Sequence, residues 1–431
     1  MKNKIQTLLL LAITAIAFVS CDDDETLPST KACFSFEPAE SIQVGDTVFF
    51  KNCSEEATEY AWNFGDEGVS TDAEPFHIYE APGSYSVNLV ATNGTVNHTA
   101  TQTVDVAADL AYVINYDSYS GDKATISAYN PYTDEVTNGY YKSVNLVGMI
   151  ANVQYAYNYK GNIYFMDNNA DGISWVDANS FEQTANAITE GIVKPRFCVG
   201  HNDFLYVSCY GGDVWGDVTL GYIAKINLKT KEVSKIEMPG GPEGAEIIDG
   251  KLYVALRYGK KMGIMDLATE EISYVDCASQ PVFLEKDPQN NLYVVLTKNY
   301  GDTETQTGIT LFNTQSNTFG ETYALDGIGN TYDNVIEANS DFTKLYVTNS
   351  KGWGQPGGVA IFDVAAKQFA AENHIDGVEA MNGMQVVGDK IYCFVSPNTT
   401  SNGKAIIFSM EGEKVTEFET GISPIMIVKS K

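Results

Sequence analysis

The chain has 431 residues, which is enough for two or three domains. Its 56 acidic residues against 27 basic ones give a formal net charge of −29, so a nucleic-acid phosphate backbone would be repelled and nucleic-acid binding is not expected. The 26 tyrosines, the 37 glycines and the scarcity of long helical patterns indicate an all-β protein with many turns.

The N-terminus is typical of an export signal. Residues 1–20 carry two early lysines and then an uncharged stretch, Leu8 to Val19, which is shorter than the ~20 apolar residues that span a bilayer. The stretch ends in Phe18-Val19-Ser20-Cys21, which resembles a bacterial lipobox and implies that Cys21 is lipidated. A plain cleaved signal followed by an incidental cysteine is the alternative.

Residues 21–30 are predicted to be an acidic linker. Asp22-Asp23-Asp24-Glu25 resembles the surface-export signal of Bacteroidetes lipoproteins, although a solvated acidic linker would have the same composition. No later segment holds 18 consecutive apolar residues. We therefore expect a soluble protein on a lipid anchor, exposed on the surface of an outer membrane.

Residues 31–107 show short runs with period-two alternation, which favours half-buried strands. Among them stand Trp62-Asn63-Phe64-Gly65-Asp66, then Pro75-Phe76-His77-Ile78-Tyr79, then Pro82-Gly83-Ser84-Tyr85. This pattern resembles the PKD (polycystic-kidney-disease) domain, with Glu67 as a one-residue departure in the loop. The resemblance implies an immunoglobulin-like β-sandwich that acts as a spacer or adhesion module, with His77 in the core or a turn rather than in catalysis.

One disulfide is predicted in this segment. Cys33 and Cys53 lie symmetrically about the turn Ser41 to Gly45, so they would face each other in an antiparallel hairpin. Two free buried thiols are the alternative. The cysteines after Cys21 show no CxxC spacing, so a zinc site is not expected.

Residues 108–431 repeat. A tyrosine inside a short apolar run recurs seven times, as Tyr112, Tyr164, Tyr206, Tyr253, Tyr293, Tyr346 and Tyr392. Each run precedes a second apolar strand, and a third strand and a Pro- or Gly-marked innermost strand follow. Four short strands at a period near 40–50 residues indicate one blade of a β-propeller, so we predict seven blades.

The two ends of the repeat predict how the ring closes. The first repeat begins at Tyr112 with no innermost strand before it, whereas Pro424 to Val428 is an innermost strand with no blade after it. The C-terminal strand is therefore predicted to complete the first blade, which removes the exposed sheet edges.

One face of this propeller is predicted to bind a ligand. Loops between the second and third strands of a blade open on the same face as the junctions between blades, and here these loops are long and aromatic. Aromatic side chains clustered on a rigid scaffold are typical of binding sites. The candidate residues are Tyr116, Tyr119, Arg196, Tyr210, Trp215, Glu243, Arg257, Tyr258, Gln280, Tyr300, Asn334, Trp353 and Met381. The alternative for any one ring is packing between blades or under a loop.

Catalytic motifs are missing from the sequence. It contains four histidines and no HExxH, GxSxG or P-loop pattern, so we expect a protein that is not an enzyme and that requires no cofactor. Asp167, Asn169 and Asp171 precede Gly172 in the spacing of the first half of a calcium loop, but Ala178 stands where the closing Glu would be. Calcium binding and an ordinary Asx-rich turn are both open.

The repeat region resembles the YncE-like propellers of Bacteroidetes surface lipoproteins. The resemblance rests on the Leu-Tyr-Val runs, on the Ile-x-x-Asp strands and on Gly241-Pro242-Glu243-Gly244. Among lipid-anchored members it is similar to the BtuG cobalamin-binding proteins, which implies a corrinoid ligand and a TonB-dependent outer-membrane transporter as partner. The alternatives are a glycan-binding surface lipoprotein and a propeller lyase or hydrolase.

Overall fold

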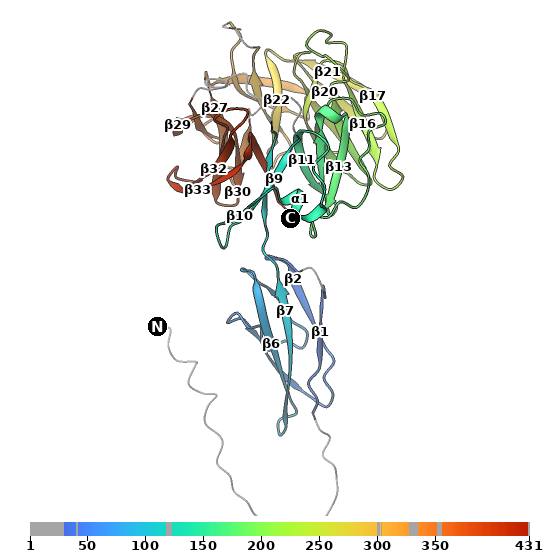
Figure 1. Ribbon diagram of the computed structural model, residues 1–431, viewed down its shortest axis with the longest axis vertical. Helices are drawn as coiled ribbons and strands as arrows, with labels where there is room; N and C mark the ends of the chain where they lie inside the picture. The colour runs from blue at the N-terminus through green and yellow to red at the C-terminus, as the bar shows by residue number, and fades with distance from the viewer. Residues whose placement is uncertain are drawn as a thin grey trace, which may run out of the picture. The chain divides into compact units, whose positions relative to one another are not determined.

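The computed structural model describes residues 30–39, 42–117, 123–299, 302, 304–326, 335–350 and 356–429. The chain divides into two compact units, with the division between Ala107 and Ala108. Both are built of antiparallel sheets, and the described residues contain one α-helix, α1 (Tyr140–Asn145), and one 3₁₀ turn, η1 (Asn168–Ala170) (Figure 1). No helix among these residues is long and apolar enough to cross a membrane.

The first unit is the sandwich predicted from the sequence. One sheet has the order β1-β2-β5 and the other has the order β4-β3-β6-β7. Trp62 and Phe64 of the PKD-like motif are buried between the sheets, and His77 stacks on Phe64 while its Nε2 lies 2.7 Å from Oδ2 of Asp66. The strands are β1 (Phe34–Glu37), β2 (Thr47–Asn52), β3 (Glu59–Asn63), β4 (Val69–Ser70), β5 (Phe76–Ile78), β6 (Gly83–Thr92) and β7 (Asn97–Val106).

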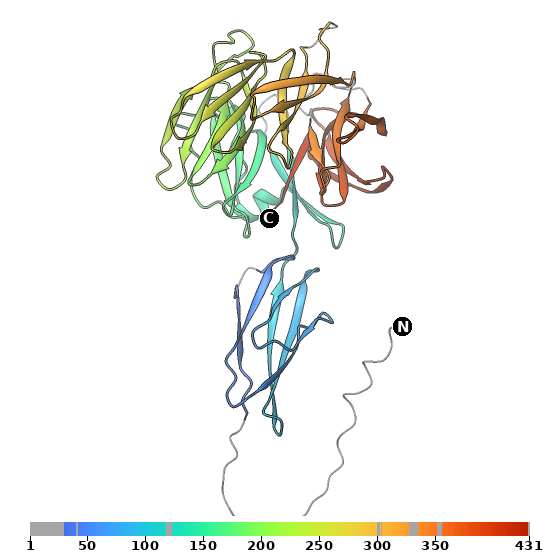
Figure 2. The same cartoon turned by 180° about the vertical axis from the view of Figure 1, so that it is seen from behind.

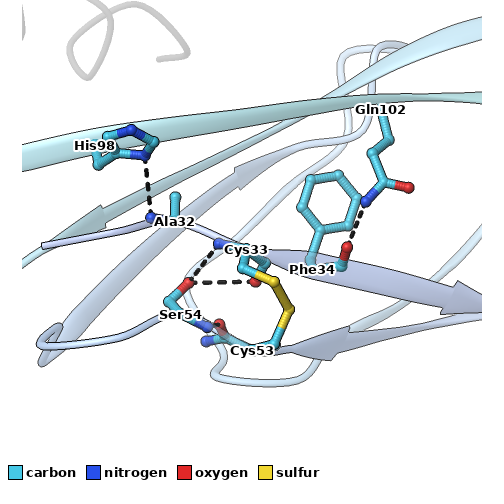
Figure 3. The surroundings of a disulfide bond; sticks show 8 residues. Ala32, Cys33, Phe34, Cys53, Ser54, His98 and Gln102 are labelled. Carbon is cyan, nitrogen blue, oxygen red and sulfur yellow. Dashed lines mark hydrogen bonds between the residues drawn. A yellow bond between two sulfur atoms is a disulfide. The ribbon is translucent and has the colours of Figure 1, made fainter.

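The Cys33–Cys53 disulfide is present in this unit, at the predicted pair of positions. Phe34 pairs with Asn52 in the β1–β2 ladder, so the two cysteines come opposite each other one step further along. The amide of Cys53 donates to the carbonyl of Cys33 at 2.9 Å, and the Ser54 hydroxyl accepts from the amide of Cys33 at 3.1 Å (Figure 3). Four other described cysteines, namely Cys198, Cys209, Cys277 and Cys393, are free thiols.

The second unit is a seven-bladed propeller (Figures 1 and 2). The first blade has the order β10-β9-β8-β34, so the C-terminal strand is its innermost strand, as the ends of the repeat predicted. The last blade, β30 to β33, lies beside β9 and β10 of the first blade. Ring closure therefore joins the two ends of the repeat within one sheet.

The blades comprise the following strands, from the innermost outward in each. They are β34 (Pro424–Lys429), β8 (Ala111–Asn115), β9 (Thr125–Asn130) and β10 (Glu135–Asn138); β11 (Val153–Tyr159), β12 (Asn162–Asp167) and β13 (Gly172–Asp177); β14 (Pro195–His201), β15 (Phe204–Cys209), β16 (Tyr222–Asn227) and β17 (Val233–Glu237); β18 (Pro242–Ile248), β19 (Lys251–Leu256), β20 (Lys261–Asp266) and β21 (Ile272–Asp276); β22 (Gln280–Lys286), β23 (Leu292–Thr297), β24 (Gly308–Asn313) and β25 (Thr318–Ala324); β26 (Ile336–Ala338), β27 (Lys344–Ser350), β28 (Gly357–Asp363) and β29 (Gln368–Val378); β30 (Met381–Val387), β31 (Lys390–Val395), β32 (Asn402–Ser409) and β33 (Lys414–Ile422).

The second blade corrects the prediction of four strands in every blade. Its sheet has the order β11-β12-β13, and in place of a fourth strand a single bridge joins Ile188 to Ile173. The segment 182–187 reads Glu-Gln-Thr-Ala-Asn-Ala, whose apolar side chains are two small alanines, so an outer strand here would bury little apolar surface.

The seven repeated tyrosines lie between blades. In the third blade, Leu205 and Val207 pack against the second blade while Tyr206, between them in β15, packs against the fourth. The same arrangement recurs around the ring, and Tyr392 of the last blade packs against Ala111 and Val113 of the first. Both faces of the strand are buried, which explains why these strands read as continuous apolar runs.

We predict that the disulfide stabilises the first unit alone. Replacing both Cys33 and Cys53 with serine should lower the free energy of unfolding of this unit by about 2–4 kcal/mol, because a closed loop of this size restricts the unfolded chain. Hydrogen exchange should become faster at the amides of β1 and β2 and stay unchanged in the propeller. Reductant should have the same effect on the wild-type protein and none on the variant; an effect of reductant on the variant would contradict the assignment.

Candidate functional site

A pocket of about 330 Å³ opens on the face where the sequence predicted ligand binding. Its walls come from the β8–β9 loop, from β11, from the β12–β13 connection and from the β15–β16 loop, so three consecutive blades contribute. The lining residues are Tyr116, Gln154, Asn168, Asn169, Lys194, Arg196, Tyr210, Gly212, Asp213 and Trp215. Tyr116, Arg196, Tyr210 and Trp215 among them were predicted from the sequence.

An aromatic cluster forms one side of the pocket. The rings of Tyr210, Trp215 and Tyr258 lie edge-on to one another, with centroids 5.8–6.2 Å apart. The indole nitrogen of Trp215 donates to the hydroxyl of Tyr258, which fixes the indole although 63% of the residue is exposed. Only 2% of Tyr210 is exposed, so this ring follows the packing alternative, although the residue still lines the pocket.

A buried ion network lies next to the aromatic cluster. Arg196 makes two hydrogen bonds to Glu243, from Nε to Oε2 at 3.1 Å and from Nη2 to Oε1 at 3.2 Å. Nη1 of Arg257 lies 3.7 Å from the same Oε1, and the hydroxyl of Tyr210 also donates to that oxygen. Burial disfavours the charge of Arg196, but the Glu243 carboxylate outweighs this and raises the arginine pKa. Burial also raises the pKa of Tyr210, so its hydroxyl keeps the proton that it donates.

A second layer of side chains holds the network in place. The guanidinium of Arg196 lies 4.7 Å from the ring centroid of Tyr210, and that of Arg257 lies 5.2 Å from the ring centroid of Tyr258. Oε1 of Gln280 accepts from Nε of Arg257 at 3.5 Å, and its Nε2 donates to Asn299 at 2.9 Å. Gln280 is buried, so its place in the site is to orient Arg257.

Beneath this network a cavity of about 230 Å³ lies on the propeller axis, and all seven innermost strands contribute to its lining. Arg196 and Gln154 line both this cavity and the pocket above, while Glu243 and Arg257 line the axial cavity. The ion network therefore stands at the boundary between the face of the propeller and its axis.

Three glutamates that the sequence did not single out also line the axial cavity, namely Glu246, Glu285 and Glu337. Burial raises the pKa of all three, to about 7 for Glu285 and to about 8 for Glu337, where the neighbouring charge of Glu285 adds to the effect. Each pairs with the repeated tyrosine of its blade, as Glu246–Tyr253, Glu285–Tyr293 and Glu337–Tyr346. The sequence could have indicated these glutamates, because each is the residue of the innermost strand that pairs with the repeated tyrosine.

The three calcium candidates lie at the end of β12. Asp167 is fully buried, and burial raises its pKa to about 7 although the neighbouring Ser174 lowers it. Asn169 lies in η1, and Asp171 accepts from the amide of Lys194 at 2.9 Å and pairs with its ammonium at 3.7 Å. Across the described ranges, no three His, Cys, Asp or Glu side chains are grouped so as to hold a metal ion.

The remaining candidates fall into two sets. Met381 is corrected from a binding residue to a core residue, because it is 4% exposed and packs with Tyr346 and Ile391 between the sixth and seventh blades. The other set lies outside the described residues and comprises Cys21, Tyr119, Tyr300, Asn334 and Trp353.

The axial glutamates predict a pH dependence of stability. A carboxyl whose pKa rises from the usual 4.5 to about 7 or 8 on folding favours the folded state below pH 4.5, and this contribution is lost as the pH rises through the folded value. Glu337→Gln should therefore raise the free energy of unfolding at pH 8.5 by about 1–3 kcal/mol and have little effect at pH 4.5. Glu271→Gln, at an exposed position, is the matched control, and its effect on the free energy of unfolding should be the same at pH 4.5 and pH 8.5. An equal gain at both pH values for Glu337→Gln would contradict the assignment.

Comparison with known proteins supports the architecture. Residues 34–108 match the PKD domain family. No curated protein matches the sequence.

Solved structures similar to the chain are propeller proteins at low identity. One is a quinoprotein alcohol dehydrogenase-like protein from Bacteroides thetaiotaomicron, with 13% identity, a TM-score of 0.57, and coverage of 90% of this chain and 96% of that one. Another is a 6-phosphogluconolactonase-like protein from Bacteroides fragilis, with 12% identity, a TM-score of 0.55, and coverage of 75% and 98%. These similarities show the fold alone, and the chain is a PKD domain followed by a seven-bladed propeller.

Proposed function

We propose that this protein captures a small ligand on the open face of its propeller, that the ligand is a corrinoid such as cobalamin, and that capture precedes uptake through a TonB-dependent outer-membrane transporter. The observation that carries the proposal is the pocket beside Trp215, which gathers aromatic rings and amides from three blades. Rigid aromatic rings bury a large contact area at a low cost in side-chain entropy.

The rings and amides of the pocket suit a wide ligand that carries amides, and its charged residues, Lys194, Arg196 and Asp213, can meet a charged group of that ligand. Tyr116 and Trp215 offer apolar surface, while Gln154, Asn168 and Asn169 offer amide donors and acceptors. Asn168 is already fixed by a hydrogen bond from its Nδ2 to the carbonyl of Pro195 at 2.9 Å. A corrinoid is larger than a pocket of about 330 Å³, so one edge of it would enter while the rest covered the exposed indole of Trp215.

Isothermal titration of the full chain with cyanocobalamin tests the proposal. We expect saturable binding that Trp215→Ala weakens by about 2 kcal/mol or more, because a central aromatic anchor dominates such interfaces. Tyr274→Ala is the matched control, since Tyr274 is an exposed ring on the outermost strand β21 of the fourth blade. Its variant should bind like the wild-type protein.

Two outcomes would contradict the corrinoid proposal. One is the absence of heat and of retained colour when the wild-type protein is mixed with cyanocobalamin. The other is equal binding by the wild-type protein and Trp215→Ala, which would place the ligand away from this pocket.

A glycan is the second candidate ligand. Trp215 favours it, because an exposed flat indole held by a hydrogen bond can stack on a sugar ring. Binding to polysaccharides on a glycan array, lost in Trp215→Ala and combined with a negative cobalamin titration, would support this candidate over the first.

The proposed location depends on Cys21. We expect radiolabelled palmitate to be incorporated into the wild-type protein expressed in a Bacteroidetes host and not into Cys21→Ser. Cys277→Ser, a control at a free thiol in the propeller, should label normally. Intact-cell proteolysis should then degrade the anchored protein, and protection of the protein in intact cells would contradict surface exposure.

A further inference from the structure

The chain contains only two arginines, Arg196 and Arg257, against 25 lysines. Both arginines are buried, at 8% and 7% exposure, and both contact the single carboxylate of Glu243. The lysines in ion pairs are more exposed than the arginines, since their exposed side-chain fractions run from 20% at Lys225 to 75% at Lys229. The sequence thus reserves arginine for one place in the fold.

Stability gives a weak reason for this arrangement. Removing two charges from water costs about as much free energy as their mutual attraction supplies. Replacing a buried ion pair with apolar residues of similar volume therefore often leaves the stability unchanged or raises it. Here one carboxylate faces two guanidinium groups, and both groups must be desolvated. Buried charge arranged against this cost is more typical of functional sites than of structural cores.

Guanidinium chemistry indicates the kind of ligand. A guanidinium is planar, stays charged at every physiological pH, and presents paired N–H groups that match the oxygens of a carboxylate or a phosphate. The guanidinium of Arg196 lies against the ring of Tyr210 and that of Arg257 against the ring of Tyr258, and Gln280 accepts a hydrogen bond from Nε of Arg257. The groups are therefore oriented before any ligand arrives.

The cavity next to the arginines suits a negative group. Arg196 and Arg257 both line the axial cavity of about 230 Å³, and Arg196 also lines the pocket on the face. Besides Glu243, the acidic side chains that line this cavity are Glu246, Glu285 and Glu337. Because burial raises the pKa of Glu285 to about 7 and that of Glu337 to about 8, much of their negative charge is absent near neutral pH. As protonated acids they can donate hydrogen bonds.

We infer that Arg196 and Arg257 form an oxyanion subsite at the mouth of the axial cavity, which binds the carboxylate or phosphate group of a small ligand in partial exchange for Glu243. The inference deepens the proposed function and rests on it for the route of entry through the pocket beside Trp215. The shared chemistry is a negatively charged group with two or more oxygens.

The test is isothermal titration of the full chain at pH 6.5 with three probes, namely inorganic phosphate, glucuronate and glucose. We expect phosphate or glucuronate to bind and glucose, which lacks the charge, not to bind. If phosphate has the lower Kd, the natural ligand carries a phosphate group; if glucuronate has the lower Kd, it carries a carboxylate. Arg257→Gln should weaken anion binding about ten-fold or more, since one charged hydrogen-bonding pair is lost. Lys225→Gln, on β16 with its own partner Glu270, is the matched control and should bind like the wild-type protein.

Glu243→Gln separates an oxyanion subsite from a purely structural network. Removing the competing carboxylate should lower the midpoint of thermal unfolding of the free protein and tighten anion binding several-fold. A structural network predicts the first change without the second. If Arg257→Gln does not fold, Glu243→Gln still decides the question.

The inference is overturned if neither anion binds the wild-type protein, if Arg257→Gln binds as well as the wild-type protein, or if folded Glu243→Gln binds anions no more tightly. Its failure is distinguishable from failure of the proposed function. Anion binding at the arginines without cobalamin or glycan binding refutes the proposed function alone. Cobalamin binding that depends on Trp215, without any anion binding, refutes the subsite alone.

Discussion

The propeller depends on one repeated contact, the packing of a tyrosine from the second strand of each blade into the core of the next blade. Each of the seven inter-blade cores contains one of these tyrosines, from Tyr112 between the first and second blades to Tyr392 between the last and the first. The neighbouring side chains on the same strand pack the opposite way. Every second strand is therefore buried on both faces, and a blade without its neighbours would expose one of them. The packing of Tyr392 against the first blade and the addition of β34 to that blade therefore serve the same purpose, which is to bury both faces of every blade.

The rigid ring explains how a site can be built from separate blades. Tyr116, Gln154 and Trp215 come from three blades and are far apart along the chain, yet they line one pocket. Their loops have little regular structure of their own, and the strands beneath set their positions. A site of this kind needs no long helix or metal to hold it together, because the inter-blade cores supply the stiffness.

The charged groups of the propeller are unevenly distributed, which the net charge of the chain does not show. The chain carries −29, but its two arginines and three raised-pKa glutamates are concentrated around the axis. The arginines lie at the mouth of the cavity, and burial raises the pKa of Glu285 to about 7 and that of Glu337 to about 8. Burial disfavours the charge of both kinds of group. At Arg196 the Glu243 carboxylate outweighs this effect, whereas at Glu337 the neighbouring charge of Glu285 adds to it.

The sequence by itself determined the architecture, because the signals for it are local. The resemblance of the motif around Trp62, Phe64 and His77 to the PKD domain implied the sandwich. The apolar runs around seven tyrosines indicated the blades, and the two ends of the repeat indicated how the ring closes. The sequence also predicted which face carries the long aromatic loops, since strand direction alone decides on which side each loop emerges. The sequence failed where contacts between blades decide the outcome. Met381 is predicted among the ligand-binding residues but packs in a core, and the second blade lacks its fourth strand. The sequence also left open which rings are packed, and Tyr210 is one of them. Only the tertiary structure brought Arg196, Glu243 and Arg257 together and set Glu246, Glu285 and Glu337 around one cavity. Their separations depend on how seven sheets close around an axis, which no local period encodes.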